Sequence, residues 1–210
     1  MIADDLKNDN HGTNTTLPPE NRMSAASRPL PMTVAEFLAW NPAESDRWEL
    51  IDGIPRAMAP SAPRHGAIQA ETARLTGNHL AETRPACRVI TEAGIQPRVR
   101  AGFNVRVPDI AITCGAWKPD DKVLREPLVV IEILSPSNEA DTWNNVWSYT
   151  TIPGLKEILV LHTAGIRAEL LRREEDGAWP DNPLPLMAGD TVTLESIGFS
   201  VPLAALYRTA

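Results

Sequence analysis

The run Leu128-Val129-Val130-Ile131-Glu132-Ile133-Leu134-Ser135-Pro136-Ser137 is the most apolar in the chain, and Val105-Arg106-Val107-Pro108-Asp109-Ile110-Ala111-Ile112 precedes it. Each is a β-branched run of strand length with one carboxylate among apolar neighbours, Asp109 or Glu132. A buried sheet tolerates an ionised carboxylate only when it is paired, hydrogen-bonded or bound to a metal. Two such strands side by side would bring the carboxylates together, and repulsion would raise a pKa unless a cation lay between them. The two runs therefore predict a divalent-metal site.

Composition favours one folded domain with a tail. The chain has 210 residues, 43% of them hydrophobic, which suits one core. Residues 1–31 are rich in Asp, Asn, Thr, Ser and Pro and predict a disordered or loosely attached tail, which leaves 32–210 as the domain. A net charge of -7 is unlike the basic face usual for nucleic-acid binding. A local basic patch is still open, because three arginines cluster in sequence, Arg98, Arg100 and Arg106. The alternative is that they are ordinary solvated charges at a strand edge.

The cysteines and the terminus indicate a soluble cytoplasmic protein. Cys87 and Cys114 lie in strand-like runs outside any Cys-x-x-Cys pair, so we expect free buried thiols in a reducing cytoplasm rather than a disulfide. No stretch is long and apolar enough to span a membrane, and the polar N-terminus lacks the apolar core of a signal peptide.

Local patterns predict helices packed on a mixed sheet, an α/β or α+β domain. Thr33 and Glu36 form a capping box that begins a helix ending at Trp40. Asp52-Gly53 is a hairpin turn between strands 47–51 and 54–59. The remaining elements expected are helices over 64–83, 139–150 and 203–207, and strands over 87–96, 103–107, 109–114, 128–134, 155–162, 166–172 and 191–195.

Aromatic and histidine side chains leave several interpretations open. Trp143 and Trp147 are four residues apart on one helix face, which favours a core or subunit interface over a base-stacking platform. His65 and His79 lie near the two ends of the long helix, where surface or half-buried histidines are common. His65 is the better functional candidate, because helix starts often border clefts.

Several blocks taken together resemble the Uma-type group of bacterial restriction endonucleases, within the PD-(D/E)XK nuclease superfamily. The resemblance runs from Met32 to the C-terminus. Its blocks are Met32-Thr33-Val34-Ala35-Glu36-Phe37-Leu38, Arg47-Trp48-Glu49-Leu50-Ile51-Asp52-Gly53, His65, Val107-Pro108-Asp109-Ile110-Ala111, the run from Leu128 to Ser137, Asp141, Tyr149 and Pro153-Gly154-Leu155-Lys156-Glu157.

This resemblance implies a restriction-endonuclease-like core, a mixed central sheet flanked by helices. It also implies that Asp109 and Glu132 bind a divalent metal, Mg²⁺ or Mn²⁺, with the backbone carbonyl of Ile133 as a further ligand. Glu49 matches an acidic residue that would complete the site, and oxygen ligands suit such ions. The implied activity is metal-assisted hydrolysis of DNA phosphodiester bonds.

The chain departs from its relatives at the catalytic lysine. The superfamily places Lys two residues after the Glu, where this chain has Leu134, and some members place it at the position of Asn145. A lysine there orients water and stabilises charge, whereas Asn donates a hydrogen bond without charge. Lys156 or Arg106 is a candidate substitute, and His65 and Asn145 are additional candidate site residues.

Three readings therefore remain. The first is a metal-dependent endonuclease acting on DNA. The second is a degenerate nuclease fold that binds nucleic acid or a partner protein without cutting. The third is structural, with Asp109 ending a turn after Pro108 and Glu132 paired with an arginine such as Arg106. A homodimer is expected from the Trp-bearing helix and from the need of many nucleases to cut two strands.

Overall fold

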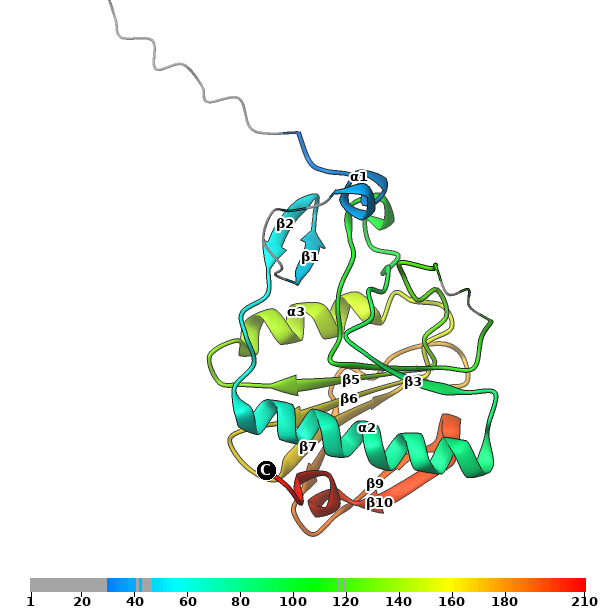
Figure 1. Ribbon diagram of the computed structural model, residues 1–210. Coiled ribbons are helices and arrows are strands. Elements are labelled where there is room, and N and C mark those ends of the chain that lie inside the picture. Colours follow the sequence, from blue (N-terminus) through cyan, green and yellow to red (C-terminus); the bar gives the residue numbers. More distant parts are fainter. Residues whose placement is uncertain (1–29, 41, 43–46, 117, 119) are drawn as a thin grey trace, which may run out of the picture.

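A computed structural model describes residues 30–40, 42, 47–116, 118 and 120–210 (Figure 1). The tail predicted over 1–31 lies outside these residues except for its last two positions. The predicted domain from residue 32 onward contains all of the helices and strands described below.

The centre of the fold is a six-stranded mixed sheet in the order β3-β4-β5-β6-β7-β8. The pair β5–β6 is parallel, and every other neighbouring pair in the sheet is antiparallel. This confirms the predicted mixed sheet. The strands are β3 (Arg88–Thr91), β4 (Ile110–Thr113), β5 (Val129–Leu134), β6 (Glu157–His162), β7 (Arg167–Arg172) and β8 (Leu184–Met187).

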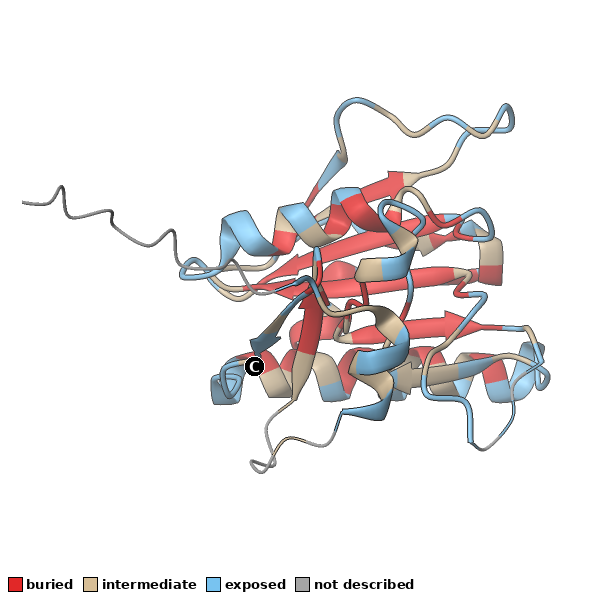
Figure 2. Cartoon of the chain, turned by 90° about the horizontal axis from the view of Figure 1, so that it is seen from above, coloured by how far each residue is buried: buried red, intermediate tan, exposed pale blue. Residues whose placement is uncertain are grey.

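Helices cover both faces of the sheet. The helix α3 (Glu139–Tyr149) lies on one face and α2 (Pro63–Thr83) on the other (Figure 1). Alternate residues of β5 serve the two layers, because successive strand side chains point to opposite faces. Ile131 packs in the core layer on the α2 side, and Val130 packs in the layer beneath α3. Burial is greatest along the central strands (Figure 2).

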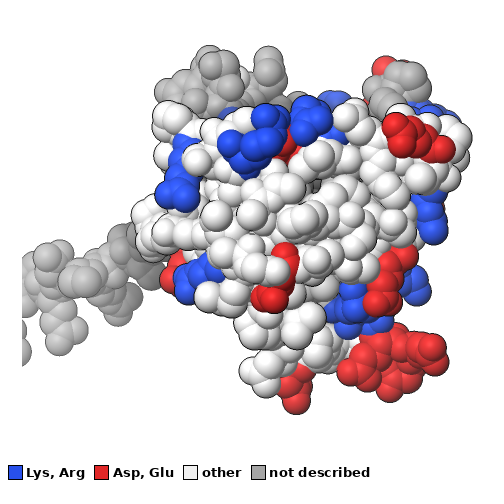
Figure 3. Space-filling model, turned by 90° about the horizontal axis from the view of Figure 1, so that it is seen from below, with Lys and Arg blue, Asp and Glu red and all other residues white. Residues whose placement is uncertain are grey.

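The C-terminal elements join α2 on its face. They are the hairpin of β9 (Thr191–Leu194) and β10 (Phe199–Pro202), with the 3₁₀ helices η2 (Glu195–Ile197) and η3 (Leu203–Tyr207). Uncharged side chains predominate on the outer surface seen from this side, and acidic and basic groups lie around its edges (Figure 3). In the part of the chain described, no helix is long and apolar enough to cross a bilayer.

The N-terminal elements are a short helix and a separate two-stranded hairpin, which lies above α3 in Figure 1. The helix α1 (Val34–Ala39) begins with the predicted capping box. The strands β1 (Trp48–Ile51) and β2 (Ile54–Ala57) are antiparallel. Their turn has positive φ at both Asp52 (52°) and Gly53 (83°), as a tight hairpin turn requires.

The segment before Asp109 differs from the predicted strand. It forms the 3₁₀ helix η1 (Ala101–Phe103) and then single bridges, Val105 to Leu50 and Arg106 to Ile95. Pro108 has no N–H to continue a ladder, so regular pairing resumes at β4. The bridges tie the β1–β2 hairpin to the entrance of β4. The C-terminal helix predicted over 203–207 is 3₁₀ rather than α, and β8 and β10 were not predicted.

The prediction of two free thiols was wrong, because Cys87 and Cys114 form a disulfide. Arg88 faces Thr113 in the antiparallel pair of β3 and β4, so the residues just outside that pair fall opposite each other. The two cysteines are 27 residues apart in sequence, and no local motif signalled this contact. Cys114 is also exposed rather than buried.

Candidate active site

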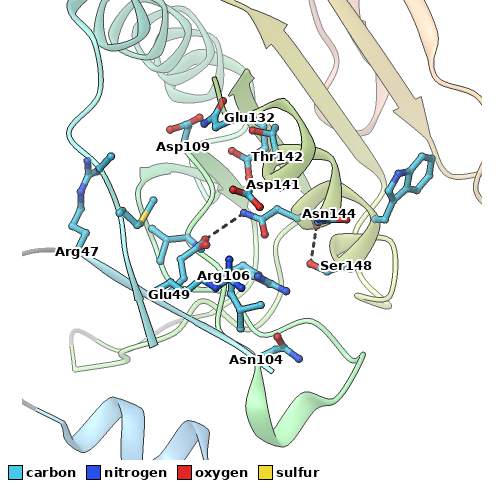
Figure 4. A pocket seen from close by; sticks show the side chains of 18 of the residues that line it. Arg47, Glu49, Asn104, Arg106, Asp109, Glu132, Asp141, Thr142, Asn144 and Ser148 are labelled. Atoms are coloured by element: carbon cyan, nitrogen blue, oxygen red, sulfur yellow. Dashed lines mark hydrogen bonds between the residues drawn. The ribbon is translucent and has the colours of Figure 1, made fainter. Parts of the chain in front are cut away.

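Strand register brings the two predicted carboxylates together. Ile110 of β4 faces Ile131 of β5 in an antiparallel pair. The residue before Ile110 therefore falls opposite the residue after Ile131, and cross-strand neighbours point to the same face. Asp109 and Glu132 lie side by side at one end of a cavity (Figure 4). Burial raises the pKa of Glu132 well above its ordinary value, and the negative charge of Asp109 raises it further.

Asp109 is held from three directions. Its Oδ2 accepts a hydrogen bond from the backbone N–H of Ile133 at 2.7 Å, and its Oδ1 lies 3.3 Å from Nε2 of His65. The side-chain amide of Gln69 donates a hydrogen bond to the backbone carbonyl of Asp109 at 2.9 Å. His65 and Gln69 are one turn apart at the start of α2. The N-terminal end of α2 thus positions the first carboxylate, and His65, one of the additional candidate residues, lies against it.

Glu132 is oriented by Tyr149, a residue to which the sequence assigned no role. The Tyr149 hydroxyl donates to Oε1 of Glu132 at 2.6 Å, and both groups are buried. Burial raises the pKa of Tyr149 well above its ordinary value, and the charge of Glu132 adds to this. Tyr149 lies one helical turn after Asn145 in α3. That spacing signals that both side chains face the same surface, and Tyr149 was also among the residues that carry the family resemblance.

Glu49 and Asn145 meet on another wall of the cavity. Oε1 of Glu49 accepts a hydrogen bond from the Val107 N–H at 2.8 Å and lies 3.5 Å from the side-chain nitrogen of Asn145. Burial raises the pKa of Glu49, while the Val107 N–H and the Arg106 charge oppose this. In the described part of the molecule, no three His, Cys, Asp or Glu side chains gather as a metal-binding set. A role for Glu49 as third metal ligand therefore stays a prediction.

The cavity has a volume of about 760 Å³ and is lined by parts of the chain far apart in sequence. Arginines come from the hairpin and from the segment before β4, and α3 supplies amides and hydroxyls (Figure 4). Trp147 of α3 also lines the cavity. No lysine is among its described lining residues. The polar groups most relevant to chemistry are Arg47, Glu49, Arg106, Asp109, Glu132 and Asn145.

Lys156, one of the two candidate substitutes for the family's lysine, lies far along the sheet from Glu132. Its backbone N–H donates to Leu128, before the start of β5, whereas Glu132 faces Val160 of β6. Four residues of strand separate Lys156 from Val160, or about 13 Å. Leu134, at the usual lysine position, packs in the core beneath α3. Arg106 does line the cavity.

The structural reading of Glu132 is not supported. Glu132 makes no ion pair with Arg106 or with any other described residue, and its partner is the Tyr149 hydroxyl. His79 and His162 lie outside the site. His79 contacts the Ile197 carbonyl, and His162 pairs with Glu169.

The donor set fits a hard divalent ion. Asp109 and Glu132 supply two carboxylates on one face of the sheet. The N–H and C=O of a strand residue point to the same side, so the Ile133 carbonyl faces the side where its N–H meets Asp109. Carboxylate and carbonyl oxygens are the ligands that Mg²⁺ and Mn²⁺ favour. The negative charges of Asp109 and Glu132 repel each other, and a cation bound between them would relieve this repulsion.

The two tryptophans of α3 have different environments. Trp143 packs against the core beneath α3, as the core reading predicted. Trp147 is 43% exposed and lines the cavity, with its ring centroid 6.0 Å from that of Trp143. The outer tryptophan is thus available to a ligand or to another subunit.

Comparisons with known proteins bear on the family and on the fold. The model of the family described as "Uma2: Putative restriction endonuclease" matches residues 34–204. The Synechocystis protein slr1290, described as uncharacterized, is 28% identical over 185 residues, which cover 87% of this chain and 95% of that protein. A crystal structure from Anabaena variabilis, described as "a putative nuclease belonging to DUF820", superposes with a TM-score of 0.69 at 20% identity. It covers 85% of this chain and 98% of that one, and the likeness establishes the fold.

Proposed function

This chain belongs to the Uma2 family, and from that premise we propose that it is a divalent-metal-dependent endonuclease that hydrolyses phosphodiester bonds of DNA. The observation that carries the proposal is that Asp109, just before β4, lies beside Glu132 of β5 and accepts a hydrogen bond from the Ile133 N–H. Holding two acids this close in a sheet costs stability, because burial and mutual repulsion outweigh the Tyr149 hydrogen bond at Glu132, and such a cost is typical of a functional site.

The residues have separable tasks. Asp109, Glu132 and the Ile133 carbonyl would hold Mg²⁺ or Mn²⁺, which supplies positive charge against the charge that builds on a phosphate during hydrolysis. His65 and Tyr149 keep the two carboxylates in place through their contacts with Asp109 Oδ1 and Glu132 Oε1. Such supporting contacts commonly control metal affinity.

Glu49 is suited to accept the proton of the attacking water. Its Oε1 is engaged by Val107 and Asn145, and its Oε2 makes no hydrogen bond among the described residues. Burial raises the pKa of Glu49, which brings its basicity closer to the range useful at neutral pH. Asn145 would orient this carboxylate through its side-chain amide.

A second candidate function is favoured by a specific observation. Leu134 is core, Asn145 is uncharged, and the described lining of the cavity has no lysine. A nuclease fold that has lost this charge could bind nucleic acid or a partner protein without cleaving it. The same carboxylates would then hold a metal that serves binding alone.

Nicking of supercoiled plasmid with Mg²⁺ or Mn²⁺ tests the proposal. Wild type should nick, and Asp109→Asn and Glu132→Gln should abolish nicking. Glu195→Gln is a matched control, because Glu195 is 63% exposed and pairs with Arg172 away from the cavity. Equal nicking by wild type and Glu132→Gln would refute the catalytic reading. Metal binding without nicking would favour the binding module.

A further inference from the structure

The side chain of Arg106 is largely buried and has no hydrogen-bonded partner among the described residues. The residue is 6% exposed, and its Nε is among the buried polar atoms that have no hydrogen bond. Within the described part of the chain, its guanidinium makes no ion pair and no hydrogen bond. Arg47 and Arg100, by contrast, pair with Glu92 and Asp52. A guanidinium whose Nε is buried and unpaired costs stability, so its presence calls for an explanation.

The backbone holds Arg106 firmly at the cavity wall. Its N–H and carbonyl exchange hydrogen bonds with Ile95 at 2.9 and 2.7 Å. Its neighbour Val105 exchanges two more with Leu50, both at 2.9 Å. The side chain faces the cavity beside Glu49 (Figure 4). Its charge lowers the pKa of Glu49 and that of Tyr149, against the larger raising effect of burial on each.

We propose that Arg106 binds a non-bridging phosphate oxygen of the substrate and supplies the positive charge that Leu134 and Asn145 do not. The identity of the substrate as DNA rests on the proposed function, whereas the anion site rests on the unpartnered guanidinium. A guanidinium matches phosphate with parallel N–H donors and stays protonated at all working pH values. Arg106 therefore binds and stabilises charge, and it moves no proton.

Removing the charge separates this role from a structural one. Arg106→Met keeps the aliphatic stem, which lies in the wall, and removes the unpaired guanidinium. The melting temperature should stay the same or rise, because replacing a buried charge with an apolar group of similar size removes a desolvation penalty. A structural arginine would behave oppositely, so a clear drop in melting temperature would count against the proposal.

Phosphate binding gives a readout that needs neither metal nor cleavage. Inorganic phosphate in EDTA should raise the melting temperature of wild type by about 3–6 °C at ten times its dissociation constant. Arg106→Met should lose the specific part of this shift, and Arg106→Lys should keep part of it. Arg100→Met, which removes an exposed arginine six residues away, should behave as wild type and shows the general salt effect.

Oligonucleotide binding distinguishes a phosphodiester from free phosphate. For a short single strand measured by fluorescence anisotropy, Arg106→Met should lower the slope of log affinity against log salt by about 0.7. Equal phosphate shifts and equal slopes in Arg106→Met and wild type would overturn the inference, even if wild type nicks plasmid. Loss of phosphate binding in the variant with no nicking by wild type would remove the nuclease proposal and leave the anion site.

Discussion

Replacing Tyr149 with Phe removes one hydroxyl from the buried wall behind the paired carboxylates. That hydroxyl donates to Glu132 Oε1 at 2.6 Å, and both side chains are buried beneath α3. The ring itself remains, so packing in the core layer that contains Val146 and Leu155 is preserved. The substitution therefore tests a single contact.

The expected losses follow from the charge on the acceptor. A hydrogen bond to an ionised buried carboxylate contributes about 1.5–3 kcal/mol, against about 0.5–1.5 kcal/mol for a neutral pair. We expect Tyr149→Phe to lower the free energy of unfolding by the larger amount at a pH where Glu132 is ionised. The bond also opposes the burial that raises the pKa of Glu132, so its loss raises that pKa further. Protons then compete better with metal, and affinity should fall about 10–100-fold.

Tyr207→Phe is a matched control. The Tyr207 side chain is also buried, but the partners of its hydroxyl are neutral. The hydroxyl accepts a hydrogen bond from the His162 backbone N–H at 3.0 Å and donates one to the Arg167 backbone carbonyl at 2.8 Å. Burial raises the pKa of Tyr207 to about 12, so the phenol stays neutral over the measured range. This variant should lose about 0.5–1.5 kcal/mol and bind metal as wild type does.

Urea denaturation measures the free energy of unfolding of wild type, Tyr149→Phe and Tyr207→Phe, and titration calorimetry measures their affinity for Mn²⁺. A double-mutant cycle with Glu132→Gln then isolates the coupling between the two groups. Unchanged stability together with unchanged metal affinity in Tyr149→Phe would refute the reasoning, because it would mean that Glu132 needs no donor. A change in stability alone would limit Tyr149 to a structural role.

Four further predictions follow from other contacts. Asn145→Lys places an ammonium beside Glu49 and should raise plasmid nicking by up to about 100-fold; no change would indicate that Arg106 already supplies the charge. Hydrogen bonds from Arg74, and to a smaller extent from Arg208, lower the pKa of Glu71 to about 2. The free energy of unfolding should therefore fall as the pH drops from 4.5 toward 2, because the folded state loses these bonds when Glu71 is protonated. In urea titrations at several pH values, Glu71→Gln should show a smaller fall. Trp147→Ala should convert the expected homodimer to monomer in analytical ultracentrifugation if the exposed ring lies at a subunit interface; an unchanged mass with weakened oligonucleotide binding would instead indicate base stacking. Cys87→Ser should cost about 3–4 kcal/mol of unfolding free energy, given a separation of 27 residues, and an equal melting temperature with and without reductant would contradict this.

Local pattern was sufficient for much of the fold. The apolar run at β5, the capping box of Thr33 and Glu36, and the Asp52-Gly53 turn each act over a few residues, and each appears as expected. The short strands β8 and β10 were missed, because edge hairpins with mixed exposure lack a strong period. The cysteine pairing was missed for a different reason, since it depends on the register of β3 and β4.

The candidate site divides in the same way. Asp109 and Glu132 could be named from the chain alone, because a solitary acid in an apolar strand is costly and therefore stands out. Their meeting depended on the pairing of Ile110 with Ile131, and the support from Tyr149 and His65 came from helices packed on opposite faces. The sequence offered Arg106 both as one of three clustered arginines and as a candidate substitute for the lysine. Only the fold shows that its side chain is largely buried without a partner among the described residues. Composition and short-range pattern reveal which charged groups would lose stability on burial, whereas contacts between distant segments decide which groups they face in the fold.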